Sequence, residues 1–300
     1  MQRRGVELLG YTVQQIGNAK NITNFGRFKS AFGASPSTLC TIYEDLQTSS
    51  IVDDGFIVKL VGDDTSLKWF LISFHFLRKY PTEKDRSLTF NVSERYSRDL
   101  IWTMLRRVQA LKAKKITWPD DLGGSDSWIM TVDGTHCWIA EPKHKTWSQD
   151  SDYYSHKYNK AGIDYELGIS LNSQKLIWMN GPFKAGKNDK FIFKHKGLKD
   201  RLHQLGKKAI GDSGYVGYRQ HCSTPNPSDS ATVKKFKSRA LLRQESFNGM
   251  TKVFESLSGR FRHSVEKFPI VFEAVCVICQ YKTEFEQPLY DILVEDVLNI

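Results

Sequence analysis

The hydrophobic pattern of this 300-residue chain changes partway along, and this change limits most strongly how the chain can fold. Before a polar, glycine-containing stretch at residues 117–127, apolar residues recur every three or four positions, which is typical of amphipathic helices. After that stretch, short runs of alternating or continuous apolar residues favour strands. We therefore expect a helical region over residues 1–118 and an α/β domain over residues 119–300.

One part of the helical region has the pattern of a DNA-binding motif. The segment "NFGRFKSAFGASPSTLCTIYEDLQTS", residues 24–49, contains two helix-length stretches broken at Gly33. Ser35 followed by Pro36 is a helix start signal, with serine as the cap and proline in the first turn. A helix, a short glycine-containing turn and a second helix predict a helix-turn-helix. An ordinary helical hairpin is the alternative.

The order of the elements after the linker predicts a mixed sheet. "SWIMTVDGTHCWI" is expected to be a strand, and "YELGISL" and "KLIWMNGPF" to form a hairpin. One helix over "NDKFIFKHKGLKDRLHQLG", a strand over "KKAIGDSGY" and a longer helix over "SRALLRQESFNGMTKVFESLSGRF" follow. Last comes an apolar helix, "FPIVFEAVCVICQYKTEF". Strands interleaved with helices in this way indicate an α/β sheet with helices on its faces.

Composition narrows the partners and the compartment. A net charge of +10 and a pI of about 9.2 favour a polyanionic partner, nucleic acid before a membrane. No apolar run is long enough to predict a membrane span. The five cysteines are irregularly spaced, which argues against a disulfide framework and suits a nuclear or cytosolic protein. Cys276 and Cys279 form a lone CxxC in an apolar run, where buried thiols are expected rather than zinc ligands.

Three acidic residues are candidates for a metal site. Asp133 lies in the middle of an apolar strand, where a carboxylate needs a partner. Asp212 lies at the carboxyl end of a later strand, and Glu245 lies in the helix that follows. Carboxylates brought together repel one another, and Mg²⁺ or Mn²⁺ would remove that repulsion. The alternatives are that Asp212 caps the next turn and that Glu245 is a solvated helix residue.

The same residues carry a resemblance to a known family. "VDGTH" at Asp133, "GDSGY" at Asp212 and "RQESFNGMTKVFESL" at Glu245 resemble the three acidic motifs of DDE transposases, most closely the PIF/Harbinger group and its bacterial relatives. Two further stretches between these motifs, "SHKYNKAGIDYELGISL" and "GPFKAGKNDKFIF", are also similar. The resemblance implies a ribonuclease-H-like catalytic domain in which Asp133, Asp212 and Glu245 are both the catalytic residues and the ligands of two divalent ions.

The resemblance also implies an activity and partners. The expected reaction is metal-dependent cleavage of DNA and strand transfer at transposon ends. A homodimer and a separate DNA-binding protein are further partners that it allows. The expected location is the nucleus if the source is eukaryotic, and the cytoplasm otherwise. The rival interpretation is a domesticated DNA-binding or partner-binding protein without catalysis. A nuclease of the same fold that does not transfer strands is a third.

Other polar residues receive weaker predictions. A basic cluster near Glu245 is expected to contact DNA phosphates, although a solvated face is the alternative; its members are Lys234, Lys235, Lys237, Arg239 and Arg243. His136 would face away from Asp133 on an alternating strand, so we expect it to be structural. Asp189 is expected to cap its helix. Glu255 shares a predicted helix with Glu245, but only Glu245 matches the family motif.

Overall fold

The computed structural model describes residues 1–17, 22–48, 64–119, 127–142, 151–195 and 197–292. The chain divides into two compact units, each made of segments that are not consecutive in sequence. The helical unit contains Met1–Lys115, Thr251–Gly259 and Lys267–Gln287. The α/β unit contains Ile116–Met250, Arg260–Glu266 and Pro288–Ile300. The predicted boundary at 118/119 lies close to the first crossing between the units, but the apolar helix near residue 276 lies in the helical unit.

The helical unit is built around two long, buried helices, α5 and α13. Helix α13 packs against α4, α7, α8 and α12, and α5 packs against α1, α3, α7 and α12. The bounds in this unit are α1 Gln2–Leu8, α2 Val13–Ile16, α3 Ile22–Phe32, α4 Pro36–Thr48, α5 Asp64–Lys79, α6 Glu83–Phe90, α7 Glu94–Ala110, α8 Lys112–Lys115, α12 Glu255–Ser258 and α13 Phe268–Phe285.

The predicted helix pair near the N-terminus is present as α3 and α4. Gly33 ends α3 with a φ of +83°, a conformation that glycine adopts without strain. Ser35 Oγ then accepts a hydrogen bond of 3.2 Å from the Thr38 amide, which caps α4 as expected. Helix α4, "PSTLCTIYEDLQT", contains no lysine or arginine. Its role in DNA binding stays a prediction.

The α/β unit holds the expected mixed sheet, so the predicted fold class is confirmed. Among the described residues the sheet has six strands: five follow the order β2-β3-β1-β5-β6, and the sixth, β4, also pairs with β3. Strand β3 is antiparallel to β1, β2 and β4, whereas β5 is parallel to β1 and to β6. The strand bounds are β1 Trp128–Trp138, β2 Tyr154–Ser155, β3 Lys160–Ser170, β4 Leu176–Lys184, β5 Lys208–Gly211 and β6 Cys222–Ser223.

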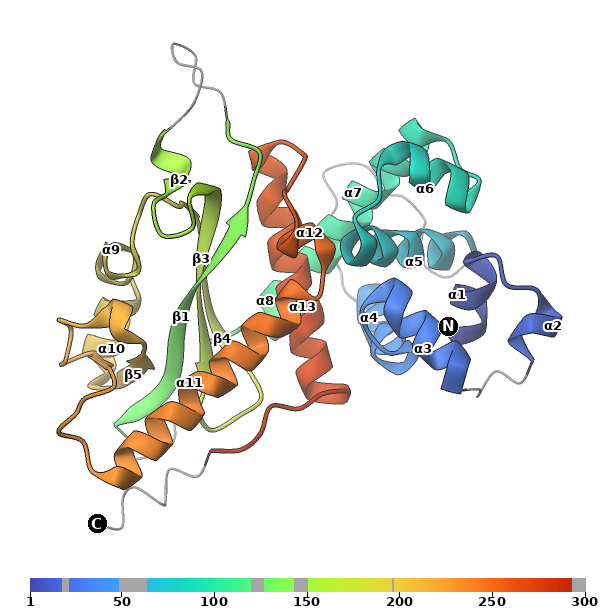
Figure 1. Ribbon diagram of the computed structural model, residues 1–300. Helices are drawn as coiled ribbons and strands as arrows, with labels where there is room; N and C mark the ends of the chain where they lie inside the picture. Colours follow the sequence, from blue (N-terminus) through green and yellow to red (C-terminus); the bar gives the residue numbers. More distant parts are fainter. Residues whose placement is uncertain (18–21, 49–63, 120–126, 143–150, 196, 293–300) are drawn as a thin grey trace. The chain divides into compact units, whose positions relative to one another are not determined.

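Helices cover both faces of this sheet. Helices α9 (Asp189–His195) and α10 (Leu198–Leu205) lie on one side, and α11 (Ala231–Lys252) runs across the other (Figure 1). On the first side, Met130 and Val132 of β1 share a core with Phe193 and Leu198. On the second side, Ile210 of β5 packs with Phe236 and other buried residues of α11. Alternate residues of β1 therefore face α9 or α11.

Two helix predictions were wrong in their extent. The single helix predicted over residues 188–206 is two helices, and Gly197 between them has a φ of +99°. The helix predicted to carry both Glu245 and Glu255 ends at Lys252, and Glu255 begins the separate α12. Phe254 causes this break, because its backbone is extended and its side chain is fully buried.

The prediction that Cys276 and Cys279 are buried is confirmed. All five thiols are free, and Cys276 and Cys279 are buried in α13. Burial raises the pKa of Cys279 to about 12, so the free thiol is protonated at neutral pH. Within the described part of the chain, no helix is both long and apolar enough to cross a membrane.

Candidate active site

Asp133 lies where β1 loses its parallel neighbour. The pairing of β1 with β5 ends at Val132 and Gly211, and β1 then runs on to Trp138. The Asp133 carboxylate is held by two hydrogen bonds: Oδ1 accepts from the Gly134 amide at 2.8 Å, and Oδ2 accepts from Asn248 Nδ2 at 2.8 Å. Because Asn248 belongs to α11, Asp133 leaves the strand on the α11 side of the sheet.

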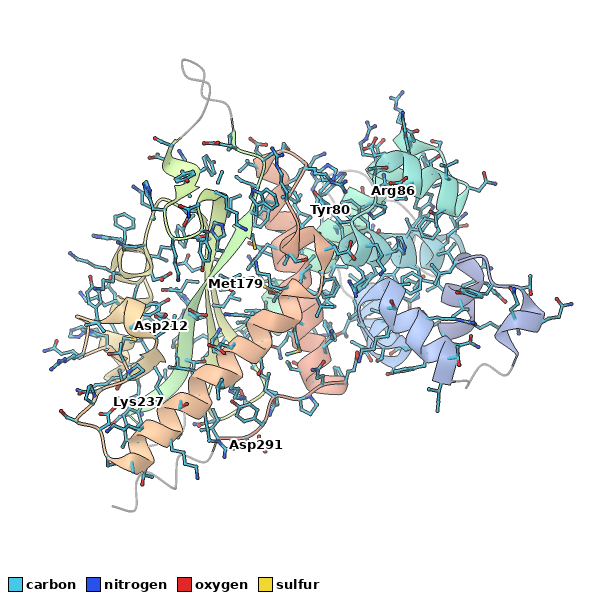
Figure 2. The ribbon with its side chains drawn as sticks, in the orientation of Figure 1. Tyr80, Arg86, Met179, Asp212, Lys237 and Asp291 are labelled. Carbon is cyan, nitrogen blue, oxygen red and sulfur yellow. The ribbon has the colours of Figure 1, made fainter. Side chains whose placement is uncertain are left out.

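Asp212 directly follows β5, the parallel neighbour of the strand that carries Asp133. It follows Gly211 directly, just as Asp133 follows Val132, so the two aspartates occupy matching positions at the carboxyl end of the β1–β5 pair. Figure 2 shows Asp212 beside the sheet at this end of β5. Asp212 Oδ1 accepts a hydrogen bond of 2.8 Å from the Gly214 amide. It therefore caps the turn after β5 and also lies beside Asp133.

Asp189 joins these two residues, although the sequence predicted it to be a helix cap. That prediction was wrong, because Asn188 Oδ1 accepts the capping hydrogen bond from the Phe191 amide at 2.9 Å. The Asp189 carboxylate lies over Gly134 so closely that a methyl group there would overlap it. A methyl group at Gly214 would lie 2.8 Å from Asp212 Oδ1 and 3.1 Å from Asp189 Oδ2. Asp133, Asp189 and Asp212 form what we call the acidic cluster.

The members of the acidic cluster affect one another's charge. Burial raises the pKa of Asp133 to about 7, with further contributions from the negative charges of Asp212 and Asp189. Burial also raises the pKa of Asp189, and the charges of Asp212 and Asp164 add to it while Lys157 opposes it. These carboxylates are thus costly to ionise together, and a cation between them would lower that cost.

The structure does not bring Glu245 to the acidic cluster. The face of α11 toward β1 presents Gln244, which accepts a hydrogen bond of 2.7 Å from Thr131 Oγ1, and Asn248. Glu245 is exposed and lines a shallow surface hollow with Arg239, Leu242, Ser246 and Tyr290. Among the described residues, no hydrogen bond or ion pair joins Glu245 to either aspartate. Its assignment as the third carboxylate stays a prediction that rests on the motif.

Glu255 does not lie on the same helix as Glu245, where it was predicted. It belongs to α12 in the helical unit, where one carboxylate oxygen lies 3.6 Å from Arg78 Nη1. The comparison of Glu245 and Glu255 as two residues of one helix therefore does not apply.

The predicted DNA-binding cluster separates into buried and exposed residues. Lys237, labelled in Figure 2, is buried and donates to Asp229 Oδ2 at 2.7 Å and to the Thr224 carbonyl at 3.0 Å. Arg243 is also buried and donates to the Ser170 and Ser173 carbonyls. The charged groups of Lys237 and Arg243 therefore form hydrogen bonds inside the α/β unit. Lys234, Lys235 and Arg239 are exposed, and Arg239 also donates to the Asp291 carbonyl.

His136 faces away from Asp133, as predicted, and its structural role stays a prediction. It lies opposite Asp164 in the β1–β3 register, and its Nδ1 is 2.7 Å from Asp164 Oδ1. Its ring stacks on Tyr158 with centroids 4.2 Å apart. His136 and Gly134 share the face of β1 opposite to Asp133, as strand alternation requires.

The residues present suit a hard divalent cation in their chemistry. As placed, no group of three acidic, histidine or cysteine side chains among the described residues is arranged around a single ion. The donors that do gather are carboxylates, which Mg²⁺ and Mn²⁺ prefer. Gly134 and Gly214 leave room around them that any larger residue would fill. Asp189 was missed because an acidic residue at a helix start is usually a cap. The preceding residue, Asn188, is also a good helix cap. Its presence in the sequence was the signal that Asp189 need not be the cap.

Comparison with known proteins gives one family match. The family model described as DDE superfamily endonuclease matches residues 132–280, from β1 into α13. No curated protein and no solved structure matches the chain significantly. The matched range begins one residue before Asp133 and contains Asp189, Asp212 and Glu245. Residues 132–280 of this chain are a DDE superfamily endonuclease domain.

Proposed function

We propose that this protein is a metal-dependent DNA endonuclease of the transposase type. The observation that carries the proposal is that Asp133 and Asp212 each directly follow the last paired residues, Val132 and Gly211, of two adjacent parallel strands. The raised pKa of Asp133 supports it, because a site that holds several carboxylates together is one that a cation can stabilise. The family match adds the reaction class, since DDE endonucleases typically use divalent metals and act on DNA.

The roles of the chain's own residues follow from their contacts. Asp133 and Asp212 would hold the cation, which when bound helps to activate water and to stabilise the leaving oxygen. In the hydrolysis a new bond would form between water oxygen and phosphorus as the water gives up a proton, and the bond from phosphorus to the 3′-oxygen would break as that oxygen takes up a proton to become a hydroxyl. Asn248 and the Gly134 amide fix the orientation of the Asp133 carboxylate, and the Gly214 amide fixes that of Asp212. Such support keeps metal ligands in position.

DNA is the substrate that the charge of the chain supports. The net charge of +10 would attract a polyanion, and Lys234 and Lys235 offer exposed cations on the helix that carries Asn248. We propose DNA carrying the terminal repeats of a transposon as the specific substrate.

A second candidate function is DNA binding without cleavage. The exposed position of Glu245 favours it, because a domain that had lost catalysis would no longer need this side chain at the acidic cluster. The two functions differ in one measurable property, metal-dependent strand breakage.

The test is cleavage of DNA carrying candidate terminal repeats, with Mg²⁺ or Mn²⁺, by the full chain and by Asp133→Asn. We expect the wild type to cut, and the variant to lose cutting while it keeps DNA binding. Without metal, the variant should melt at the same or a higher temperature, because it removes a buried charge from beside two others. Cutting by the variant at the wild-type rate would contradict the assignment. Binding without cutting by the wild type would favour the second candidate.

A further inference from the structure

A small pocket opens on the face of β1 that is opposite to Asp133. Gly134 and His136 of β1 and Asp164 of β3 form its floor, and residues 154–158 and 185–189 form its walls. Its volume is about 210 Å³. A protein cavity of about 150 Å³ accepts benzene, whereas drug-sized ligands need about 300 Å³ or more. This pocket, which we call the β2–α9 pocket, therefore has room for one flat ring system.

The lining of the β2–α9 pocket combines aromatic rings, cations and carboxylates. Tyr158 is 42% exposed and stacks on His136 with ring centroids 4.2 Å apart. Lys157 and Lys187 are exposed, whereas the Asp164 side chain is only 14% exposed and lies 2.7 Å from His136 Nδ1. Cations thus lie at the rim, and a hydrogen-bond acceptor lies deeper. A ligand that matches this order has an outer negative charge and an inner flat ring that donates hydrogen bonds.

A nucleotide has this distribution of groups. Its phosphate pairs with lysine, and its base stacks on aromatic side chains. The exocyclic amino groups of bases donate hydrogen bonds to carboxylates. An inorganic anion alone would use neither the Tyr158 ring nor Asp164, and an apolar ligand would bury that carboxylate without a donor.

The β2–α9 pocket adjoins the acidic cluster. Asp189 belongs to both, and Lys157 acts on both: burial raises the pKa of Asp133 and of Asp189, and the positive charge of Lys157 opposes this rise. Among the described residues, no strand pairs with β1 on its β5 side from Asp133 to Cys137. A single strand therefore separates the pocket from Asp133, so a nucleotide in the pocket would lie near a phosphate held at the acidic cluster.

Backbone hydrogen bonds fix the walls of the pocket. The Gly186 amide donates to the Asp152 carbonyl at 2.9 Å, and the Ala185 amide donates to the Gly162 carbonyl at 3.2 Å. A Cβ atom at Gly186 would lie 2.6 Å from the same Asp152 carbonyl, so this close approach needs a glycine. Ligand pockets are usually preformed in this way. A solvated surface turn would not require walls held so closely together.

We propose that the β2–α9 pocket binds one unpaired nucleotide of a DNA strand, with its base against Tyr158 and its phosphate at Lys157 and Lys187. A base inside a duplex is stacked and paired, so it must leave the helix to enter the pocket. Asp164 favours adenine, cytosine or guanine, which carry an amino group, over thymine. The inference rests on the proposed function only in taking DNA as the ligand, since it needs neither metal nor cleavage.

The experiment compares two DNA duplexes in their binding to the full chain, by fluorescence anisotropy without divalent metal. One duplex carries a single unpaired adenine, and the other carries an abasic site at the same unpaired position. We expect the wild type to bind the first about tenfold more tightly, within the range for one base–aromatic stack. Tyr158→Ala should lose this difference, and Tyr158→Phe should keep it because the ring remains.

Two further variants complete the design. Tyr290→Ala is the matched control, because Tyr290 is a 40% exposed tyrosine beside Arg239 of α11, and it should keep the difference between the duplexes. Lys187→Ala should weaken the binding of both duplexes alike, because the phosphate is present in both. If circular dichroism shows that Tyr158→Ala does not fold, Tyr158→Leu, which has bulk but no ring, carries the same expectation.

The outcomes separate this inference from the proposed function. Equal affinity of the wild type for the two duplexes would overturn the role of the pocket, and metal-dependent cleavage by the same protein would leave the endonuclease proposal standing. A difference that persists in Tyr158→Ala, or is lost in Tyr290→Ala, would also overturn it. Deoxyadenosine monophosphate at the concentration of the DNA should not compete, and competition would assign the pocket to a free nucleotide. A wild type that binds neither duplex would overturn both proposals.

Discussion

Burial moves the pKa values of two side chains in opposite directions, because it disfavours the charged form of each. In the α/β unit, burial raises the pKa of Asp133 to about 7, and two neighbouring carboxylates add to the effect. In the helical unit, burial lowers the pKa of His75 to about 4, and the positive charges of Lys79 and Arg86 add to it. A bound cation can relieve the first group. For His75, burial and the neighbouring positive charges favour the neutral form in the folded state.

His75 should therefore make the helical unit sensitive to acid. Its ring lies between those of Phe32 and Phe90, and its Nδ1 has no hydrogen-bond partner among the described residues. The unfolded chain takes up the proton near pH 6.5 and the folded chain only near pH 4, so stability falls as the pH drops through that window. The loss should reach roughly 3 kcal/mol. Urea unfolding between pH 7 and 4.5 measures it, and His75→Phe should flatten the dependence. An unchanged slope in the variant would refute this cause.

The sequence identified two of the acidic residues and missed the third for a physical reason. Asp133 and Asp212 stand out because each interrupts or ends an apolar strand, where a carboxylate needs an explanation. Asp189 lies next to Asn188 at a helix start, and the amino-acid sequence alone does not show which of the two caps the helix. Only the space at Gly134 and Gly214 shows where Asp189 points.

The elements with special residues at their ends were predicted well. Ser35 and Pro36 marked the start of α4, and Gly33 marked the end of α3. In α11, a buried cation was not predicted from the sequence. Arg243 lies on the same buried face of the helix as Phe236, Ala240 and Phe247. The sequence grouped Arg243 with surface cations. Arg243 is spaced three or four residues from apolar residues on both sides, and this spacing could have predicted its burial.

The turn between α3 and α4 provides a test at this scale. An alanine at Gly33 would have to adopt a positive φ, and its methyl carbon would lie 2.5 Å from the Phe254 ring. Gly33→Ala should cost about 1–2 kcal/mol for the backbone and about 1–3 kcal/mol more for the overlap. Gly10→Ala is the matched control, because Gly10 has a φ of +88° and open space around it. Urea unfolding compares the two, and equal losses would show that the Phe254 contact does not matter.

At the scale of the whole molecule, the positive charge should act through a few exposed residues. The double variant Lys234→Ala/Lys235→Ala should weaken DNA binding similarly for all sequences and lower the slope of log affinity against log salt by about 2. Lys190→Ala/Lys194→Ala removes the same charge from exposed positions on α9 and should change the slope less. Fluorescence anisotropy at several salt concentrations measures both. Equal slopes for the two double variants would show that α11 has no special role.

The interleaving of the two units predicts the behaviour of fragments. Fifteen of the eighteen residues of α13 are buried, and its helical partners include α4, α7 and α8. A fragment of residues 119–300 lacks these partners and should expose the apolar surface of α13. We expect it to bind the dye ANS strongly and to aggregate, whereas the full chain should do neither. A monomeric fragment without dye binding would contradict this expectation. Point variants are therefore better than truncations for separating DNA recognition from cleavage.

Because α13 lies late in the chain, the core of the helical unit cannot be completed early during synthesis on the ribosome. Helices α1–α8 are made first, but the helix that completes their core is encoded about 170 residues later. At 5–20 residues per second, roughly 10–30 s separate the two. During that interval most of the α/β unit is translated, while the first helices lack a main part of their core. The nascent chain must therefore keep an apolar surface of its first helices from aggregating until α13 has been translated.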